Sequence, residues 1–324
     1  MKRSLIVAAV ATVAAGASFA QSSVTIYGRL NDSIENQKTG DVKKTVLQNN
    51  ASRIGFKGVE DLGGGLKAGF QLEHGFNADN GTQSQTAFWA RQSEVFLQSA
   101  TLGTIRLGNF TSESYYATAD YVSMHNHDTG TSEDKLYNYV MRDTNKVAYR
   151  APEFVKNLSL EAAVSAPEGA VGQEKAYDFA ANYSVGDLAL GAGFSKNADD
   201  KQFGIRALYT VGAFTFGGYY QRSMLDSTFA GDGKINTVRL SGMYAVGASE
   251  FHLNFGLAGK VDGIADTDAK QATVAYNYNL SKRTKVYTFY TKVDNKPQAT
   301  YFPNGPTTKG LDFSSFAVGI RHNF

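Results

Sequence analysis

The chain has 324 residues, a formal net charge of +2 and no cysteine. Its 32 basic and 30 acidic side chains nearly balance. They create no global positive field of the kind that attracts nucleic acid, so we expect no nucleic-acid partner. The lack of cysteine excludes a disulfide framework, and stability therefore has to come from backbone hydrogen bonding or a large core.

The first 20 residues have the composition of an export signal. Lys2 and Arg3 precede an apolar run over residues 5–16, and Ser18-Phe19-Ala20 forms a small-x-small cleavage site. The apolar run is shorter than the roughly 20 residues that a membrane helix needs. We therefore expect cleavage after Ala20, leaving residues 21–324 as an exported chain without net charge.

From Val24 onward, apolar and polar side chains alternate in successive segments of about ten residues. The alternation predicts about sixteen strands. Their expected positions are 22–35, 49–60, 65–76, 87–99, 103–110, 136–150, 157–166, 175–185, 187–197, 201–211, 213–223, 234–246, 249–261, 269–280, 284–295 and 312–324. The polar face is rich in small residues, and the chain lacks the dense apolar core of a soluble sandwich. An antiparallel transmembrane β-barrel with an apolar exterior fits this pattern better.

The connections between these strands alternate between short and long. Three short turns share the form Tyr-x-Val-Gly, beginning at Tyr183, Tyr209 and Tyr244, which places tyrosines near one membrane interface. The long connections are expected near 36–48, 77–86, 111–135, 166–175, 224–234, 261–269 and 295–311. Short turns at one rim and long loops at the other are typical of outer-membrane barrels, so we expect an outer-membrane location.

The segment over residues 111–135 is the longest irregular one, and it is acidic. It carries Glu113, Asp120 and Asp128. Most connections in compact domains have only about 4 to 6 residues. A segment of this length is long enough to lie inside a barrel.

Four stretches of the sequence resemble general trimeric porins, most closely those of β-proteobacteria. They are residues 23–28 (SVTIYG), residues 52–68 (SRIGFKGVEDLGGGLKA), residues 142–154 (RDTNKVAYRAPEF) and residues 318–324 (VGIRHNF). The resemblance implies a sixteen-stranded homotrimer in outer-membrane lipid and lipopolysaccharide, with the third long loop folded into each lumen. It also implies that Phe324 is an assembly signal for the barrel-assembly machinery. One departure is Asn109-Phe110, where the family usually has Arg-Gln; Arg106 is the candidate to replace the missing base.

The resemblance implies a constriction where basic wall residues face acids of the loop. Strand phase places Arg53 and Lys57 opposite to Ile54 and Phe56, and hence toward the lumen. The expected basic wall consists of Arg53, Arg91, Arg142, Lys57, Lys67 and Lys146, with Arg150, Arg206 and Arg239 also on the inward phase. The expected acidic side consists of Glu113, Asp120 and Asp128. The implied function is general diffusion of ions and small hydrophilic solutes.

Other functions remain open at this stage. Tyr115, Tyr116 and Tyr121 would suit a stacking track in a channel specific for a sugar or an anion. His125 and His127 form an H-x-H pair, which is weak evidence for a metal, and no base-nucleophile pair is visible for an enzyme. We expect no enzymatic activity, no cofactor and no metal, and an adhesin role rests only on the surface loops.

Overall fold

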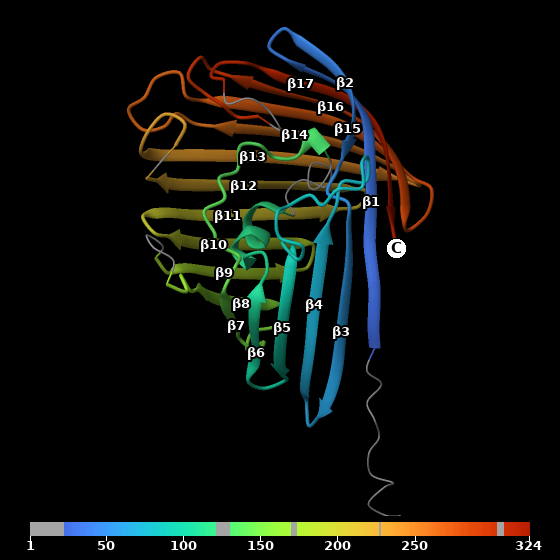
Figure 1. Ribbon diagram of the computed structural model, residues 1–324, viewed down its shortest axis with the longest axis vertical. Helices are drawn as coiled ribbons and strands as arrows, with labels where there is room; N and C mark the ends of the chain where they lie inside the picture. Colours follow the sequence, from blue (N-terminus) through green and yellow to red (C-terminus); the bar gives the residue numbers. More distant parts are fainter. Residues whose placement is uncertain (1–22, 121–129, 170–173, 227, 303–307) are drawn as a thin grey trace, which may run out of the picture.

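The computed structural model describes residues 23–120, 130–169, 174–226, 228–302 and 308–324. It contains one antiparallel sheet closed on itself, because each strand pairs with its neighbours in the chain and β1 pairs with β17. Figure 1 shows β9 to β17 running across the view, with β3 to β6 closer to vertical. The strands are β1 (Ser23–Thr39), β2 (Val42–Asn49), β3 (Arg53–Gly63), β4 (Leu66–Gly75), β5 (Gln92–Ser99), β6 (Gly103–Asn109), β7 (Lys146–Arg150), β8 (Leu158–Ser165), β9 (Ala176–Val185), β10 (Leu188–Asn197), β11 (Asp200–Val211), β12 (Phe214–Leu225), β13 (Gly233–Val246), β14 (Ser249–Ala258), β15 (Ala269–Asn279), β16 (Thr284–Asn295) and β17 (Phe313–Asn323).

The prediction of a sixteen-stranded barrel is confirmed. β2 and β3 together occupy one strand position of the barrel, because both pair with β1. β2 pairs with the second half of β1, and β3 pairs with the first half of β1. Ala51 lies between them with a φ of 57°, which interrupts the strand. The side chain of Ser52 compensates there by accepting a hydrogen bond from the backbone N–H of Asn31 at 3.0 Å.

Three expected boundaries are wrong. Residues 36–48 form most of a hairpin of β1 and β2 instead of a loop, residues 87–91 precede β5 instead of belonging to it, and residues 136–145 likewise precede β7. The hairpin turns at Gly40, which has a φ of +55°. Its sequence is polar on both sides, so the apolar alternation that marks the other strands is missing there.

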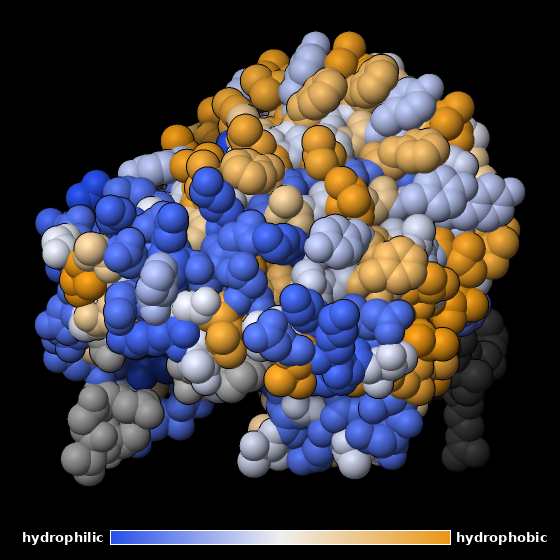
Figure 2. All heavy atoms as spheres, turned by 90° about the horizontal axis from the view of Figure 1, so that it is seen from above, coloured by the Kyte–Doolittle hydropathy of each residue, from blue (hydrophilic) through white to orange (hydrophobic). Residues whose placement is uncertain are grey.

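The two faces of the wall have opposite character. Large apolar side chains such as Ile205, Leu240 and Phe316 are exposed, whereas the residues between them on the same strands are mostly buried and small or polar. Figure 2 shows apolar side chains over a broad area at the upper right and hydrophilic ones at the lower left. The exterior is therefore apolar and the interior polar, the reverse of a soluble domain.

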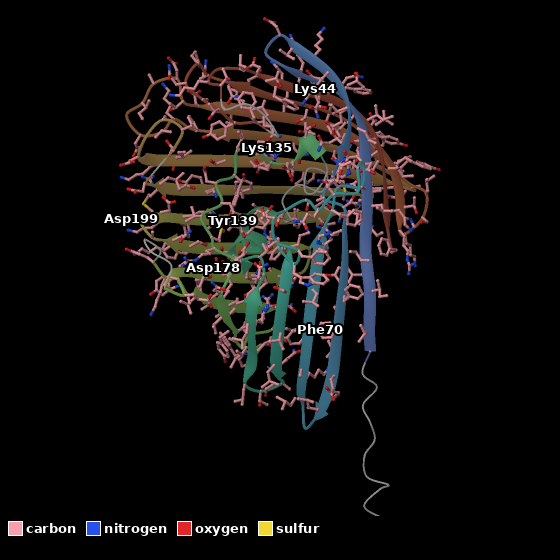
Figure 3. All side chains as sticks on the ribbon, viewed as in Figure 1. Lys44, Phe70, Lys135, Tyr139, Asp178 and Asp199 are labelled. Atoms are coloured by element: carbon pink, nitrogen blue, oxygen red, sulfur yellow. The ribbon has the colours of Figure 1, made fainter. Side chains whose placement is uncertain are left out.

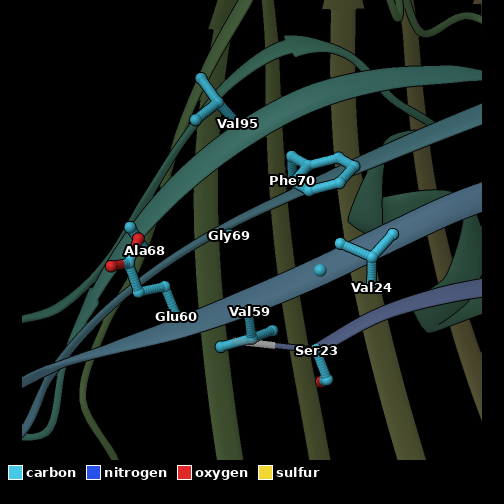
Figure 4. A pocket seen from close by; sticks show the side chains of 9 residues that line it. Ser23, Val24, Val59, Glu60, Ala68, Gly69, Phe70 and Val95 are labelled. Atoms are coloured by element: carbon cyan, nitrogen blue, oxygen red, sulfur yellow. The ribbon is translucent and has the colours of Figure 1, made fainter. Parts of the chain in front are cut away.

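A shallow apolar groove marks the exterior of β1, β3, β4 and β5. Its volume is about 260 Å³, and Val24, Phe70 and Val95 are among its lining residues (Figure 4). Gly58 leaves room for the ring of Phe70, because a Cβ at this glycine would lie 2.7 Å from the ring. The groove thus arises where a glycine replaces an outward side chain.

The two ends of the described chain close the barrel together. The backbone N–H of Gly28 donates to the carbonyl oxygen of Phe324 at 3.0 Å, and the N–H of Phe324 donates to the oxygen of Gly28 at 3.1 Å. The Phe324 ring also covers Gly28, since a Cβ on this glycine would lie 2.4 Å from the ring. The terminal residue therefore belongs to the ladder between β1 and β17.

Candidate functional site: the connection between β6 and β7

Residues 110–145, called here the inner connection, link β6 to β7. Their described parts include helix α2 (Glu113–Tyr115), the π-helical turn η1 (Tyr116–Asp120) and the 3-10 turn η2 (Gly130–Ser132). Figure 1 shows α2 and η1 in green in front of β9 to β11; α2 contacts β9 and β10, and η1 contacts β9 to β12. The connection is longer than the sequence predicted, since β7 begins only at Lys146.

The base of the inner connection is closed by Lys146. Its side chain is buried, and its Nζ donates to Phe110 O at 3.0 Å, to Ser112 Oγ at 2.6 Å and to Asp143 Oδ1 at 3.0 Å. The strand phase that placed Lys146 on the inward face is therefore compatible with the structure. Its ammonium group, however, holds the two ends of the connection together and is covered by them.

The first helical part is fixed to β9, β10 and β11. Ser114 donates two hydrogen bonds to the carboxylate of Asp178, one from its hydroxyl and one from its backbone N–H, the latter at 3.3 Å. The hydroxyls of Ser114 and Ser195 lie 2.8 Å apart. Figure 3 shows Asp178 near the helical part and Tyr139 farther along the same connection. All of these wall residues lie on the buried face of their strands.

The later part of the inner connection reaches strands far from β9. Asp134 Oδ1 lies 2.9 Å from Arg239 Nη1 on β13, and the backbone N–H of Lys135 donates to Gln271 Oε1 on β15 at 3.0 Å. The Thr131 hydroxyl donates to Glu35 Oε2 on β1 at 2.8 Å. The connection therefore contacts strands on widely separated parts of the wall.

Five charged side chains of alternating sign form a network on the wall below α2. Arg106 on β6 bridges Glu94 Oε2 at 2.9 Å and Glu161 Oε1 at 3.1 Å. Arg150 on β7 bridges Glu161 Oε2 and Glu113 Oε2, both at 2.9 Å. Burial raises the pKa of the Glu113 carboxyl, and the positive charge of Arg150 opposes this rise. Arg150 thus holds Glu113, the first acid of the connection, against the wall.

A second basic group surrounds Glu73 on β4. Glu73 Oε1 lies 2.6 Å from Arg91 Nε and 3.9 Å from Arg53 Nε. Both arginines border a cavity of about 460 Å³, which the inner connection closes from one side with two tyrosines. The lining residues are Tyr27, Gly28, Arg29, Arg53, Gln71, Glu73, Arg91, Gln92, Thr111, Tyr115, Tyr116 and Asn323.

The other expected wall bases lie outside this lining. Arg142 is in the inner connection, where its Nη2 donates to the carbonyl oxygens of Ser165, at 3.0 Å, and Glu174. Lys57 is exposed, with Nζ 5.2 Å from the centre of the Tyr27 ring, and Lys67 is exposed beside the turn between β3 and β4. These three residues are not brought together with Arg53 and Arg91.

Of the three expected acids, only Glu113 has a described side chain. The backbone of Asp120 ends η1, but its side chain lies outside the described part of the chain. Asp128, with Tyr121, His125 and His127, falls in residues 121–129, which are also outside it. The signal-peptide prediction for residues 1–20 falls outside the described residues as well. Within the described ranges, no cluster of three or more His, Asp or Glu is placed to hold a metal ion.

Sequence reasoning missed two parts of this site. Arg29 was not singled out, although its inward phase on β1 and its pairing with Arg53 place both in the same cavity. Glu73, Glu94 and Glu161 were missed because strand phase gives the face on which a side chain lies, but not which nearby charge it pairs with. Arg106 and Arg150 were recognised as candidate bases without their partners.

Comparisons with known proteins identify the family. The family model for Gram-negative porins matches residues 7–298. Outer membrane porin protein 32 of Delftia acidovorans is 31% identical with full coverage of both chains, and an outer membrane porin protein of Bordetella pertussis is 25% identical with the same coverage. Among solved structures, OmpT of Vibrio cholerae covers 95% of this chain and 100% of its own at 18% identity, with a TM-score of 0.72. OmpF of Salmonella typhi covers 93% of this chain and 97% of its own at 17% identity, with a TM-score of 0.71.

The solved structures share the fold, while the family model and the curated relatives extend over nearly the whole chain. Within the described residues, no helix is long and apolar enough to cross a membrane. The closed barrel, its apolar exterior and its full-length relatives agree with one another: this chain belongs to the Gram-negative porin family and is an outer-membrane porin.

Proposed function

We propose that this porin is a general diffusion channel in which the inner connection folds into the lumen and narrows it. The observation that carries the proposal is the set of contacts from one connection to β1, β7, β9, β13 and β15. The partner side chains on four of these strands, Glu35, Asp178, Arg239 and Gln271, are buried on the polar face of the wall, which supports a connection that lies inside the barrel.

The narrowing makes the wall charges effective. Salt screens charges beyond about 8 Å at physiological ionic strength, so an ion on the axis of an open lumen about 20 Å wide would feel them only weakly. Within a few ångströms, a unit charge interacts with an ion by about 1 to 4 kcal/mol, depending on the effective dielectric constant. Arg29, Arg53 and Arg91 share their cavity with one acid, Glu73. This imbalance favours anions over cations at that point of the pore.

Assembly follows the family pattern in this proposal. The chain forms a homotrimer in outer-membrane lipid and lipopolysaccharide, after export by the signal peptide of residues 1–20. Phe324 is read by the barrel-assembly machinery and then closes the ladder with β1. Support comes from the full-length porin relatives and from the hydrogen bonds between Gly28 and Phe324. We assign no catalytic activity, cofactor or resident metal to the chain.

Reconstitution in a planar bilayer tests the proposal. Purified protein should give ohmic single-channel steps that close in threes, and a potassium chloride gradient should give a reversal potential of the sign for anion preference. Heat-modifiable migration on a gel establishes that the sample is folded. Folded protein without any conductance would refute the channel function.

A channel specific for a sugar or an anion is the alternative, and one observation favours it. Tyr115 and Tyr116 border the arginine cavity, where an aromatic ring and a cation together would suit such a solute. Tyr115 also packs edge-on against Tyr137 and Tyr139, with ring centres 5.4 Å apart in each pair, which suits a purely structural role. Saturation of the current by one small solute at low concentration would support the specific channel, and linear flux would support general diffusion.

A further inference from the structure

Three glycines lie together on the inward face of the wall beneath α2 and η1. Gly191 and Gly193 are on β10, and Gly204 is on β11. Gly193 and Gly204 are direct partners in the ladder between the two strands, and Gly191 is the next inward position on β10. All three are buried, whereas Phe194 and Phe203, also partners in this ladder, are exposed on the outward face.

The space above these glycines is filled by the inner connection. A Cβ at Gly191 would lie 1.9 Å from the carbonyl oxygen of Ala117, and one at Gly193 would lie 2.8 Å from both Cβ and O of Ser114. A Cβ at Gly204 would lie 2.7 Å from Cγ2 of Thr118. Side chains do not approach so closely, so even alanine at these positions would force the connection to move away from the wall.

Backbone conformation does not explain these glycines. None of the three has a positive φ, unlike the turn glycines such as Gly186 and Gly212. A glycine inside a strand weakens it and often marks a place where another backbone approaches closely. The remaining reason for glycine here is therefore the space that the helical part occupies.

We propose that Gly191, Gly193 and Gly204 form a seat for α2 and η1 and act as positioning residues that set the width of the pore. The inference rests on the proposed function, in which the inner connection narrows the lumen. A missing Cβ at each position allows the helical part to lie against the wall. A residue with a Cβ at these positions would displace the connection into the lumen, and glycine leaves the lumen wider by that displacement.

The displacement follows from the distances. Ordinary van der Waals contact begins near 3.4 Å, so alanine at Gly191 pushes the Ala117 carbonyl by about 1.5 Å, and alanine at Gly204 pushes Thr118 by about 0.7 Å. If the connection halves a lumen about 20 Å wide, the opening is about 10 Å. The connection moves in from one side and narrows one dimension of the opening, so a shift of 0.7 to 1.5 Å then reduces the cross-section by roughly 7 to 15%. Conductance should fall by a similar fraction.

The test compares single-channel conductance and the size limit for neutral sugars among matched variants of the full chain. Gly191→Ala and Gly204→Ala should both lower the conductance, with the larger loss in Gly191→Ala. Gly242→Ala is the control, because this strand glycine on β13 has room for a Cβ, 3.8 Å from the Phe216 ring. Heat-modifiable migration should show that each barrel is folded.

A second variant distinguishes displacement of the inner connection from a general loss of barrel stability as the cause of a lower conductance. Thr118→Ser removes Cγ2, the atom nearest to the new Cβ in Gly204→Ala, while its hydroxyl still reaches the oxygen of Ser114. Adding Thr118→Ser to Gly204→Ala should restore most of the conductance relative to Thr118→Ser alone.

Two results would overturn the seat. One is a conductance of Gly204→Ala equal to that of Gly242→Ala, and the other is an increased conductance in either seat variant. Gly204→Ala causes the smaller displacement, so it keeps the test decisive if Gly191→Ala does not fold. If the wild-type protein itself does not conduct, the proposed function fails, which is a different outcome.

Discussion

The hydrogen bond between Thr131 and Glu35 fastens the far part of the inner connection to the first strand. Glu35 is fully buried, and its Oε2 accepts hydrogen bonds from Thr131 Oγ1 at 2.8 Å, from Gln37 Nε2 at 2.9 Å and from Ser315 Oγ at 2.9 Å. Its Oε1 accepts one more from Ser33 Oγ at 2.9 Å. We predict that Thr131→Val releases the turn η2 from the wall while leaving the barrel intact.

The magnitude follows from the loss of one hydrogen bond to a charged group. Such bonds contribute about 1.5 to 3 kcal/mol, and valine has nearly the same shape as threonine, so little packing is lost. The wall keeps three other donors for the Glu35 carboxylate, which limits the damage to β1. A loss of about 1.5 to 3 kcal/mol raises the population of the released turn by roughly 10- to 150-fold.

Hydrogen exchange followed by mass spectrometry measures this release. Peptides that include residues 130–136 should exchange faster in Thr131→Val, whereas peptides from β9 to β12 should be unchanged. Thr131→Ser is the matched control, because it keeps the hydroxyl. Equal exchange of residues 130–136 in the valine, serine and wild-type proteins would refute the reasoning.

Three further variants test the charges of the site. Replacing both Arg53 and Arg91 with glutamine should move the reversal potential toward cation preference, with a change in the permeability ratio of about fivefold or more for about 1 kcal/mol at the ion. Glu113→Gln should move it the other way, because the guanidinium that the carboxylate neutralises is left toward the lumen. Lys146→Met removes three hydrogen bonds at the base of the connection and should lower barrel stability by about 1 to 3 kcal/mol, seen as a lower temperature of heat modification.

Controls for these variants come from the same chain. Lys156→Gln changes one charge at an exposed position outside the strands, so it should leave the reversal potential unchanged. A reversal potential of the Arg53 and Arg91 double variant equal to that of Lys156→Gln would remove both arginines from the permeation path. A heat-modification temperature of Lys146→Met equal to that of the wild type would show that the base of the connection does not depend on Lys146.

Strand phase predicted the face of the wall residues well because the alternation of a strand has a period of two. Arg53 was expected from its phase to face the lumen, and it borders the cavity beside Glu73. Arg91, expected from the family resemblance, borders the same cavity but lies just before β5. Phase says nothing about distance from the axis, however. Lys146 has the expected phase, yet the connection covers it, because depth depends on what lies above a residue.

The sequence did not show which basic wall residue pairs with the acid of the inner connection. Glu113 was expected to face Arg53, Arg91 and Arg142, whereas it lies 2.9 Å from Arg150. Which strand lies below a loop depends on the path of that loop, and no periodic pattern encodes the path. The boundary error at 136–145 has a related cause, because the alternating side chains there resemble a strand. The backbone of this segment does not pair with a strand, however; the N–H and carbonyl oxygen of Asn138, for example, bond to the side chain of Gln221 on β12.

The reciprocal hydrogen bonds between Gly28 and Phe324 have a topological consequence. They make the ladder between β1 and β17 equivalent to every other ladder, so the ring of strands has no natural first member. A circular permutant that joins the two ends by a short linker and opens an outer connection, such as the one between β12 and β13, would keep all ladders. Only the order in which the strands are synthesised would change. Comparing the permutant with the original chain would therefore show whether folding depends on strand order or only on the final barrel geometry.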